Sequence, residues 1–211
     1  MEELKANKIK EYYIKGEFYD WVTKPKGFER IFHKLRENVT LGLIKNYCHA
    51  SKVLDVGCGT GLVTRHIKGE IVLGLDINNW NLKRIREHAP QTEVILGDAE
   101  SLPIRSESID TIVCTEVLEH LLHLEEVLSE MVRVLKPRGK IIGSVPSKNP
   151  IWGFRKYLTS TCLVAEPFHR NYSLKELLTF LQTSGKLKII DIGLSKLVLG
   201  LTLFFIVEKS C

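Results

Sequence analysis

The chain has 211 residues, of which 44% are hydrophobic and 26% are charged. This length suits one domain with a sizeable core, so we predict a single domain over 1–211. The formal charge of +5 and the sequence pI near 8.9 permit an anionic substrate. They fall short of the basic excess that is typical of nucleic-acid binding.

The cysteines and the apolar runs indicate the cellular compartment of the protein. Its five cysteines are scattered and form no CxxC pair, so neither a disulfide framework nor a zinc knuckle is predicted. The longest apolar run, 197–207, is roughly half of the ~20 residues that a membrane-spanning helix needs. The N-terminus carries acidic residues and has no apolar core segment. We therefore expect a cytoplasmic protein that makes no use of a membrane.

Two helices come first, and strands then alternate with helices. Short continuous apolar runs between helical stretches are typical of strands buried on both faces of a parallel sheet. The expected helices are 2–15, 27–47, 61–69, 79–89, 117–136 and 173–185. The expected strands are 52–57, 71–76, 92–98, 109–115, 140–145, 187–194 and 201–208.

Several residues should fix where the later elements begin and end. Pro137 and Gly139 should end the long helix before them, because proline cannot continue the helical ladder and glycine tolerates a left-handed turn. Ser173 and Glu176 have the spacing of a capping box that begins the last helix. The two final strands follow each other too closely for a crossover helix, so they should pair antiparallel.

These elements predict a Rossmann-like α/β fold. It would have a seven-stranded, mostly parallel sheet with helices on both faces and an antiparallel last strand. Residues 1–50 would form an N-terminal helical lid. Residues 146–172 interrupt the alternation, and we expect them to be an inserted segment on the substrate side.

A glycine-rich turn, VLDVGCGTG, follows the first predicted strand. In an open parallel sheet, ligands bind beyond the carboxyl ends of the strands. Gly57 and Gly59 lack side chains and let the backbone approach a ligand, while Gly61 eases the start of the next helix. A dinucleotide turn, G-x-G-x-x-G, would need glycine where the chain has Leu62. A nicotinamide-dependent oxidoreductase is therefore the weaker alternative.

Acidic residues end the next two strands. Asp76 ends the second strand at an offset that suits hydrogen bonds from ribose hydroxyls, and Gly97 and Asp98 end the third. Clustered carboxylates would repel a pyrophosphate. These strand ends therefore favour an adenosyl ligand that carries no phosphate.

Five segments together resemble a known family. They read VLDVGCGTG, GLDI, GDAESLP, IDTIVCTEVLEHL and EVLSEMVRVLKPRGKIIGSVP. In this order they are similar to the class I S-adenosylmethionine-dependent methyltransferases, and specifically to the type 11 group that includes ubiquinone-biosynthesis O-methyltransferases. The resemblance is strong over 50–146. It implies a methyltransferase with S-adenosylmethionine as its cofactor.

The resemblance also implies which residues contact the cofactor. They are Asp55, Gly57, Gly59, Gly61, Asp76, Asp98, Ala99 and Thr115. The glycine turn and Thr115 would lie against the methionine portion, Asp76 would bind the ribose hydroxyls, and Asp98 with Ala99 would meet the adenine. Asp55 could instead only brace the turn, and Asp98 could only cap the segment after it.

His120 is the predicted catalytic residue. Methyl transfer depends mainly on positioning, and it needs a base only when the acceptor begins protonated. Glu116, Glu119 and His120 would share one face of a helix. With His169 they resemble the magnesium-binding set of some ubiquinone-pathway and small-RNA 2′-O-methyltransferases. Whether they bind a metal stays open at this point.

We predict S-adenosylmethionine-dependent methyl transfer to a hydroxyl of a small-molecule metabolite. The partner would be this small-molecule acceptor, without nucleic acid or membrane. The alternatives are an RNA 2′-O-methyltransferase, which would need the metal set and a basic groove, and the nicotinamide-dependent oxidoreductase.

Overall fold

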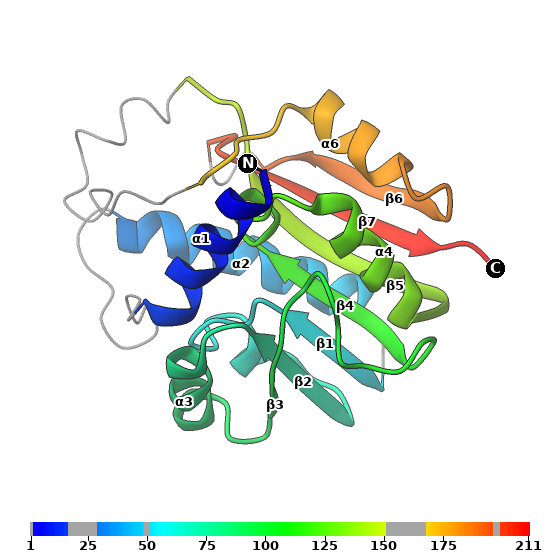
Figure 1. Cartoon of the computed structure of the whole chain (residues 1–211). Coiled ribbons are helices and arrows are strands. Elements are labelled where there is room, and N and C mark those ends of the chain that lie inside the picture. The colour runs from blue at the N-terminus through cyan, green and yellow to red at the C-terminus, as the bar shows by residue number, and fades with distance from the viewer. Residues whose placement is uncertain (1, 17–28, 49–50, 151–167, 196–198) are drawn as a thin grey trace.

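A seven-stranded sheet organises the residues that the computed structural model describes, 2–16, 29–48, 51–150, 168–195 and 199–211 (Figure 1). The strands are β1 (Lys52–Val56), β2 (Ile71–Asp76), β3 (Glu93–Leu96), β4 (Ile109–Thr115), β5 (Leu135–Pro146), β6 (Leu187–Leu194) and β7 (Thr202–Lys209). The helices are α1 (Glu2–Lys15), α2 (Glu29–Tyr47), α3 (Asn79–His88), α4 (Leu124–Val134) and α6 (Leu174–Gln182).

The strand order is β3-β2-β1-β4-β5-β7-β6. Pairing is parallel from β3 through to β5, and β7 runs antiparallel between β5 and β6. The predicted Rossmann-like fold and its antiparallel C-terminal strands are confirmed. The chain order reverses between β1 and β4, and the crevice at such a switch point is where open α/β sheets bind ligands.

Helices cover both faces of the sheet. On one face, α4 and α6 pack onto the larger core, in which Val127, Met131 and Leu177 are almost fully buried. On the other face, α2 packs over β1, β4, β5 and β7, and α3 packs against β3 and β2. Figure 1 shows α1 apart from these layers, beside the carboxyl ends of the parallel strands.

The segment after the glycine turn corrects the expected helix over 61–69. It contains only a short 3₁₀ turn, Thr64–His66. Val63, Thr64 and Ile67 are β-branched, which weakens a short helix. The Thr64 hydroxyl also donates a 2.5 Å hydrogen bond to the buried Asp55 carboxylate, which holds this segment against β1.

The expected helix over 117–136 is also corrected. A 3₁₀ turn, Leu118–His120, comes first, and α4 begins only at Leu124 and ends at Val134. Glu116 adopts a positive φ of 56°, so the chain cannot run straight from β4 into a helix. Glu116, Glu119 and His120 therefore do not share one helix face.

Pro137 and Gly139 do not end α4, because β5 already begins at Leu135. The pairing of β4 with β5 shifts its register between Ile109 and Thr111. Pro137 and Gly139 lie in the matching irregular stretch of β5. A Cβ at position 139 would come within 2.9 Å of the Asp110 carbonyl oxygen. The tight approach of two strands, and not a helix end, explains this glycine.

The other predicted boundaries agree closely with the structure. The strand expected over 92–98 ends earlier, at Leu96, because Asp98 turns the chain and accepts a hydrogen bond from the Glu100 N–H. Ser173 and Glu176 form the predicted capping box of α6. Residues 151–167 of the predicted insert lie outside the described residues, and its role and that of the N-terminal lid stay predictions.

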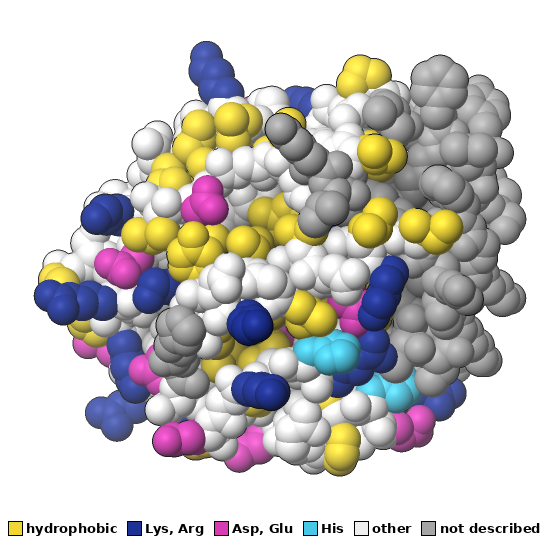
Figure 2. All heavy atoms as spheres, turned by 180° about the vertical axis from the view of Figure 1, so that it is seen from behind, with side chains coloured by type: hydrophobic (Ala, Val, Ile, Leu, Met, Phe, Trp, Pro, Cys, Tyr) yellow, Lys and Arg dark blue, Asp and Glu magenta, His cyan; other side chains and the backbone are white. Residues whose placement is uncertain are grey.

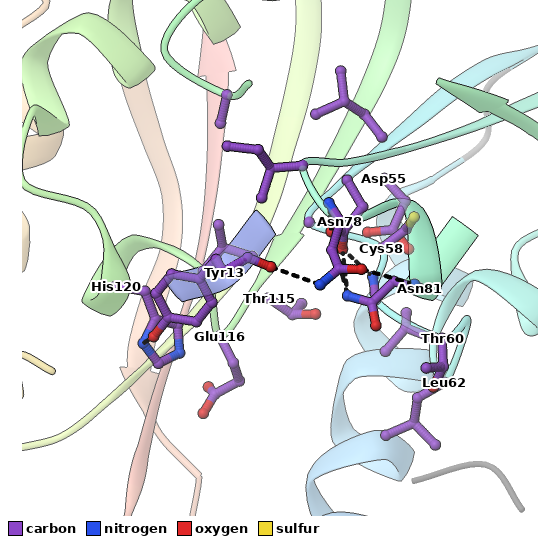
Figure 3. A pocket seen from close by; sticks show the side chains of 18 of the residues that line it. Tyr13, Asp55, Cys58, Thr60, Leu62, Asn78, Asn81, Thr115, Glu116 and His120 are labelled. Atoms are coloured by element: carbon purple, nitrogen blue, oxygen red, sulfur yellow. Dashed lines mark hydrogen bonds between the residues drawn. The ribbon is translucent and has the colours of Figure 1, made fainter. Parts of the chain in front are cut away.

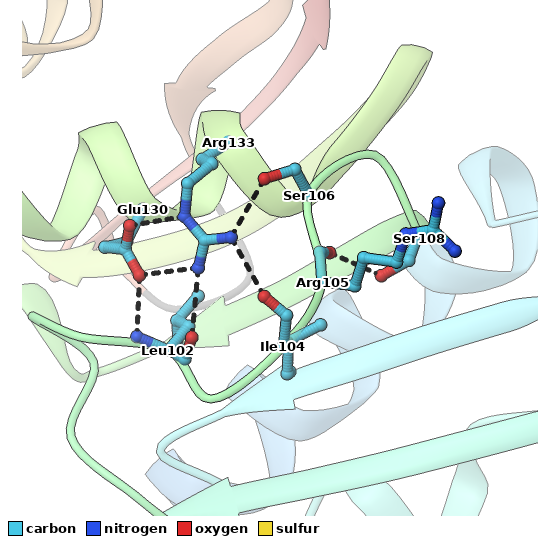
Figure 4. A network of polar contacts seen from close by, with 7 residues as sticks. All are labelled: Leu102, Ile104, Arg105, Ser106, Ser108, Glu130 and Arg133. Atoms are coloured by element: carbon cyan, nitrogen blue, oxygen red, sulfur yellow. Dashed lines mark hydrogen bonds and ion pairs between the residues drawn. The ribbon is translucent and has the colours of Figure 1, made fainter.

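An arginine network fixes the loop that leads away from β3 (Figure 4). Arg133 of α4 donates to the carbonyl oxygens of Leu102 (3.0 Å) and Ile104 (2.9 Å) and to the Ser106 hydroxyl (3.1 Å). Its guanidinium also pairs with Glu130 at 2.6 Å and holds the pKa of that carboxyl below its ordinary value. The loop that carries Asp98 is thus attached to a rigid helix.

Figure 2 shows the face of the molecule that is turned away in Figure 1. Apolar side chains gather over the upper part of this face, and most of its Lys and Arg side chains lie among Asp and Glu lower down. Large apolar side chains with high exposure include Ile190 and Leu194 of β6. None of the helices in the described ranges is both long and apolar enough to cross a bilayer.

The packing around Gly143 in β5 yields a stability prediction. A Cβ there would lie 2.2 Å from the Phe205 ring and 2.8 Å from the Cys114 carbonyl oxygen. Gly143→Ala should lower the free energy of unfolding by roughly 2 kcal/mol in urea denaturation, because the core cannot expand locally. The matched control is Gly193→Ala in β6, where a Cβ meets nothing within 4 Å and the change should stay within about 0.5 kcal/mol. Equal effects would contradict this account.

Candidate active site

A cavity of about 350 Å³ lies at the carboxyl ends of the parallel strands (Figure 3). Its floor comes from the ends of β1, β2 and β4 and from the loop after β3, while α1 and α2 supply walls. Of the predicted site residues, those lining it are Asp55, Gly57, Gly59, Asp76, Asp98, Ala99, Thr115 and His120. Only Gly61 stands back from it. The strand ends thus converge as the parallel sheet predicts.

The glycine turn forms one wall of this cavity. Gly57 has a φ of +70°, and a Cβ there would lie 2.4 Å from Val117. Gly59 has a φ of +54° but meets nothing within 4 Å, so its bare side leaves open space where the turn borders the cavity. Gly61 has a φ of +91° and packs against Ile85 of α3. The first two glycines therefore shape the cavity, and the third seats the turn on α3.

Asp76 is only 7% exposed and is held from several directions. Its Oδ2 accepts from the Gly59 N–H and its Oδ1 from the Asn78 N–H, both at 2.8 Å. The Asn81 amide lies 3.3 Å from both oxygens. Burial raises the pKa of Asp76, and the hydrogen bonds oppose that rise. The two short bonds use one lone pair on each oxygen, and a diol in the cavity could take the positions of the long 3.3 Å contacts from Asn81.

Asp55 is almost completely buried beneath the turn. Burial raises its pKa to about 7, and the nearby charge of Asp76 adds to the rise. The 2.5 Å hydrogen bond from the Thr64 hydroxyl opposes it. Asp55 both borders the cavity and braces the chain after the turn, so the two roles considered for it are compatible.

Asp98 and Ala99 border the cavity next to α1. Lys10 of α1 places its ammonium 2.8 Å from Asp98 Oδ2 and 2.6 Å from Glu100 Oε2. Asp98 also accepts the backbone N–H of Glu100, as a capping residue would. One Asp98 carboxylate therefore both turns the chain and attaches α1 to the cavity.

A second group of polar side chains faces the cavity from α1, α2 and the end of β4. The Tyr13 hydroxyl and His120 Nδ1 are hydrogen-bonded at 2.8 Å. Arg36 pairs with Glu116 at 2.5 Å, and the Ser144 hydroxyl donates to the other Glu116 oxygen at 2.9 Å. A non-glycine residue at positive φ is strained by roughly 1 kcal/mol or more. These contacts hold Glu116 in that conformation.

The four residues considered as a metal set, Glu116, Glu119, His120 and His169, are only partly brought together. The rings of His120 and His169 lie 5.3 Å apart, but the Glu116 carboxylate is engaged by Arg36 and Ser144. Among the described residues no three His, Cys, Asp or Glu side chains form a group able to hold a metal ion. The RNA 2′-O-methyltransferase alternative, which relied on this set, gains no support from the described geometry.

Sequence reasoning missed several residues of the cavity wall, among them Lys10, Arg36 and Asn78. Asn78 carried a usable signal, since asparagine two residues after a strand and directly before a helix is a typical N-cap. Lys10 and Arg36 carried none, because their neighbours in the cavity lie more than 70 residues away in the chain. Such contacts exist only in the folded protein.

Comparison with known proteins agrees with this geometry. Residues 54–143 match the family model described as "Methyltransferase domain". A probable S-adenosylmethionine-dependent methyltransferase of Mycolicibacterium smegmatis is 31% identical over 153 residues, which cover 71% of this chain and 57% of that protein. Residues 54–143 form a methyltransferase domain of the class I S-adenosylmethionine-dependent type.

Further proteins that are similar to this chain agree. The ubiquinone biosynthesis O-methyltransferase of Idiomarina loihiensis is 33% identical over 59% of this chain and 55% of its own length. The chain thus spans little more than half the length of these curated relatives. The N-methyltransferase NodS of Bradyrhizobium japonicum, solved with S-adenosylhomocysteine, matches with a TM-score of 0.66 at 15% identity, over 97% of this chain and 98% of its own. That similarity concerns the fold.

The cofactor of the family is S-adenosylmethionine, and the cavity fits it. The bare side of Gly59 leaves room beside the turn. Asp76 presents a fixed carboxylate to the cavity, and no cluster of cationic side chains of the kind that binds phosphates lies around it in the described residues. The methyltransferase-domain match over 54–143 decides against the nicotinamide alternative.

The raised pKa of Asp55 predicts how stability depends on pH without a ligand. Because the folded protein holds this proton up to about pH 7 and the unfolded chain loses it near pH 4, stability is full below pH 4 and falls as pH rises through 7. Between pH 5 and 8 the Asp55 contribution should fall by roughly 3 kcal/mol. Asp55→Asn, which can keep the Thr64 hydrogen bond, should lose this part of the decline in urea denaturation at the two pH values. An unchanged decline would show that another group causes it.

Proposed function

We propose that this protein transfers the methyl group of S-adenosylmethionine to a hydroxyl of a small-molecule acceptor, with His120 as the base. One observation carries the proposal: a single cavity joins the wall of glycines and acids to the hydrogen-bonded pair of Tyr13 and His120. The Idiomarina relative is named as an O-methyltransferase, which supports oxygen as the acceptor atom.

On the cofactor side, the proposed contacts follow the shape and charge of the wall. Gly57 and Gly59 of the turn lie against the methionine portion, together with Thr115, and Gly61 supports the turn from α3. Asp76 accepts hydrogen bonds from the ribose hydroxyls, and Asp98 with Ala99 borders the adenine. Asp55 supports the turn through Thr64 and places a titrating carboxyl near the cofactor. Support for these roles comes from the position of the side chains around the cavity.

The cofactor, when bound, supplies a methyl group on a sulfonium sulfur that an acceptor oxygen can attack in line. His120 then takes the proton that the acceptor hydroxyl loses. With its own proton on Nδ1, the imidazole donates to the Tyr13 oxygen across 2.8 Å, and Nε2 is the atom that takes the proton. Glu119 Oε1 lies 3.7 Å from Nε2 and is almost fully buried, so it stabilises the imidazolium that forms.

The ion pair of Arg36 and Glu116 contributes to positioning on the acceptor side. It joins α2 to the end of β4 across the cavity. Both side chains are only 16% exposed, so the low local dielectric strengthens the pair. In this proposal, the ion pair holds α2 against the carboxyl end of β4, where the acceptor enters.

The cofactor assignment is tested by calorimetric titration with S-adenosylhomocysteine. Asp76→Ala should weaken binding by at least about 30-fold, because hydrogen bonds to a charged acceptor are worth roughly 1.5–3 kcal/mol each. Asp191→Ala, which removes an exposed acid of β6, is the control and should bind as the wild type does. Binding of NAD in place of the adenosyl ligand, or an unchanged affinity in Asp76→Ala, would overturn the assignment.

The role of His120 is tested with hydroxylated metabolites, following formation of S-adenosylhomocysteine. Once an acceptor is found, the rate should rise with pH through the range in which imidazole loses its proton. His120→Asn should lower kcat by roughly 10²–10⁴-fold and flatten this rise. Its affinity for S-adenosylhomocysteine should stay within about threefold of the wild type, which separates lost catalysis from a damaged cavity. A variant that keeps the full rate and the pH profile would remove His120 from the proposal.

A further inference from the structure

Asn78 holds the ends of two helices with one side chain. It is 1% exposed and lies between β2 and α3. Its amide oxygen accepts from the N–H groups of Trp80 (2.7 Å) and Asn81 (3.2 Å), which caps the start of α3. Its amide nitrogen donates to the carbonyl oxygens of Tyr13 (2.6 Å) and Gly16 (2.7 Å), which lie at the end of α1. The last carbonyls of a helix lack partners within the helix, so these bonds satisfy two of them.

The same residue contacts the predicted cofactor site. Its backbone N–H donates to Asp76 Oδ1 at 2.8 Å. A second polar attachment of α1, from Lys10, reaches Asp98 at 2.8 Å. Both attachments thus join α1 to residues at, or directly bonded to, the proposed cofactor contacts. Figure 3 shows Asn78 between Tyr13 on one side and the group around Asp55 and Asn81 on the other.

Through the side chain of Tyr13, α1 also contacts His120, the proposed base. Tyr13 accepts from Asn78 with its main chain and is hydrogen-bonded to His120 with its side chain. The rings of Tyr13 and His120 lie 5.3 Å apart. The position of the Tyr13 backbone therefore decides whether its hydroxyl can reach His120 Nδ1.

We infer that Asn78 is a positioning residue that couples occupation of the cofactor site to the placement of Tyr13 against His120. A helix of 14 residues is marginal in water by itself, so α1 depends on its contacts with the body of the protein. The equilibrium is between α1 docked on the body of the protein and α1 undocked. A ligand shifts it only if it binds one of these two states more tightly than the other. A ligand bound to Asp76 fixes the carboxylate that orients Asn78. Asn78 then holds α1 more firmly, so the docked state of α1 becomes more stable. This inference rests on the proposed function.

The test compares amide hydrogen exchange of α1 in the full chain with and without S-adenosylhomocysteine. In the wild type, the ligand should slow exchange of the α1 amides by at least about fivefold. Asn78→Asp keeps an oxygen that caps α3 and puts a second oxygen where the two donors were. In this variant α1 should exchange fast with and without ligand, while α3 stays protected. Asn78→Ser, which also caps α3 but has no reach to α1, should behave in the same way.

Tyr13→Phe is the matched control, since it keeps the backbone carbonyl that Asn78 holds and loses only the hydroxyl. Its α1 amides should respond to the ligand as in the wild type. If the ligand binds and slows α1 exchange equally in the wild type and both Asn78 variants, the coupling is wrong while the proposed function stands. If the wild type does not bind S-adenosylhomocysteine, the proposed function fails and this inference fails with it.

Discussion

The buried carboxylate of Asp76 is the interaction on which the site depends. One oxygen accepts the Gly59 N–H and the other the Asn78 N–H, each at 2.8 Å. A carboxylate with so little exposure to water would be costly without such partners. The same bonds that stabilise it also fix the glycine turn to β2 and place Asn78, whose amide holds α1 and α3. The turn, two helix ends and the acid that faces the cavity are therefore set by one group.

The cavity combines a rigid side with a side built from separate elements. The rigid side is formed by strand ends, which sit in the central part of the sheet between buried layers. The other side comes from α1, α2 and the segment after β4, which meet through ion pairs and hydrogen bonds such as Arg36 to Glu116 and Tyr13 to His120. Precise cofactor placement benefits from the first. On a shared fold, loops and added helices carry specificity. We therefore expect the choice of acceptor to depend on the side built from α1, α2 and the segment after β4.

Most of the sheet could be predicted from the sequence, whereas the segments that directly follow β1 and β4 could not. Buried parallel strands are encoded by short apolar runs, so all seven were recognised within a few residues. The segments after the glycine turn and after β4 instead form 3₁₀ turns. There, Thr64 bonds to Asp55 and Glu116 takes a positive φ under the hold of Arg36 and Ser144. Side-chain contacts formed in the folded protein overrode the local helical pattern in both places.

The sequence alone determined the fold class, the glycine turn and the acids at the strand ends, because strand ends and the turns after them are read from neighbouring residues. Only the tertiary structure decided which partners those groups have. Lys10 meets Asp98, Tyr13 meets His120, and Asn78 joins α1 to α3. The sequence placed Glu116, Glu119 and His120 on one face, and the folded chain separates their roles. The physical reason is that side-chain pairing between distant segments depends on how helices dock on the sheet, which local periodicity does not encode.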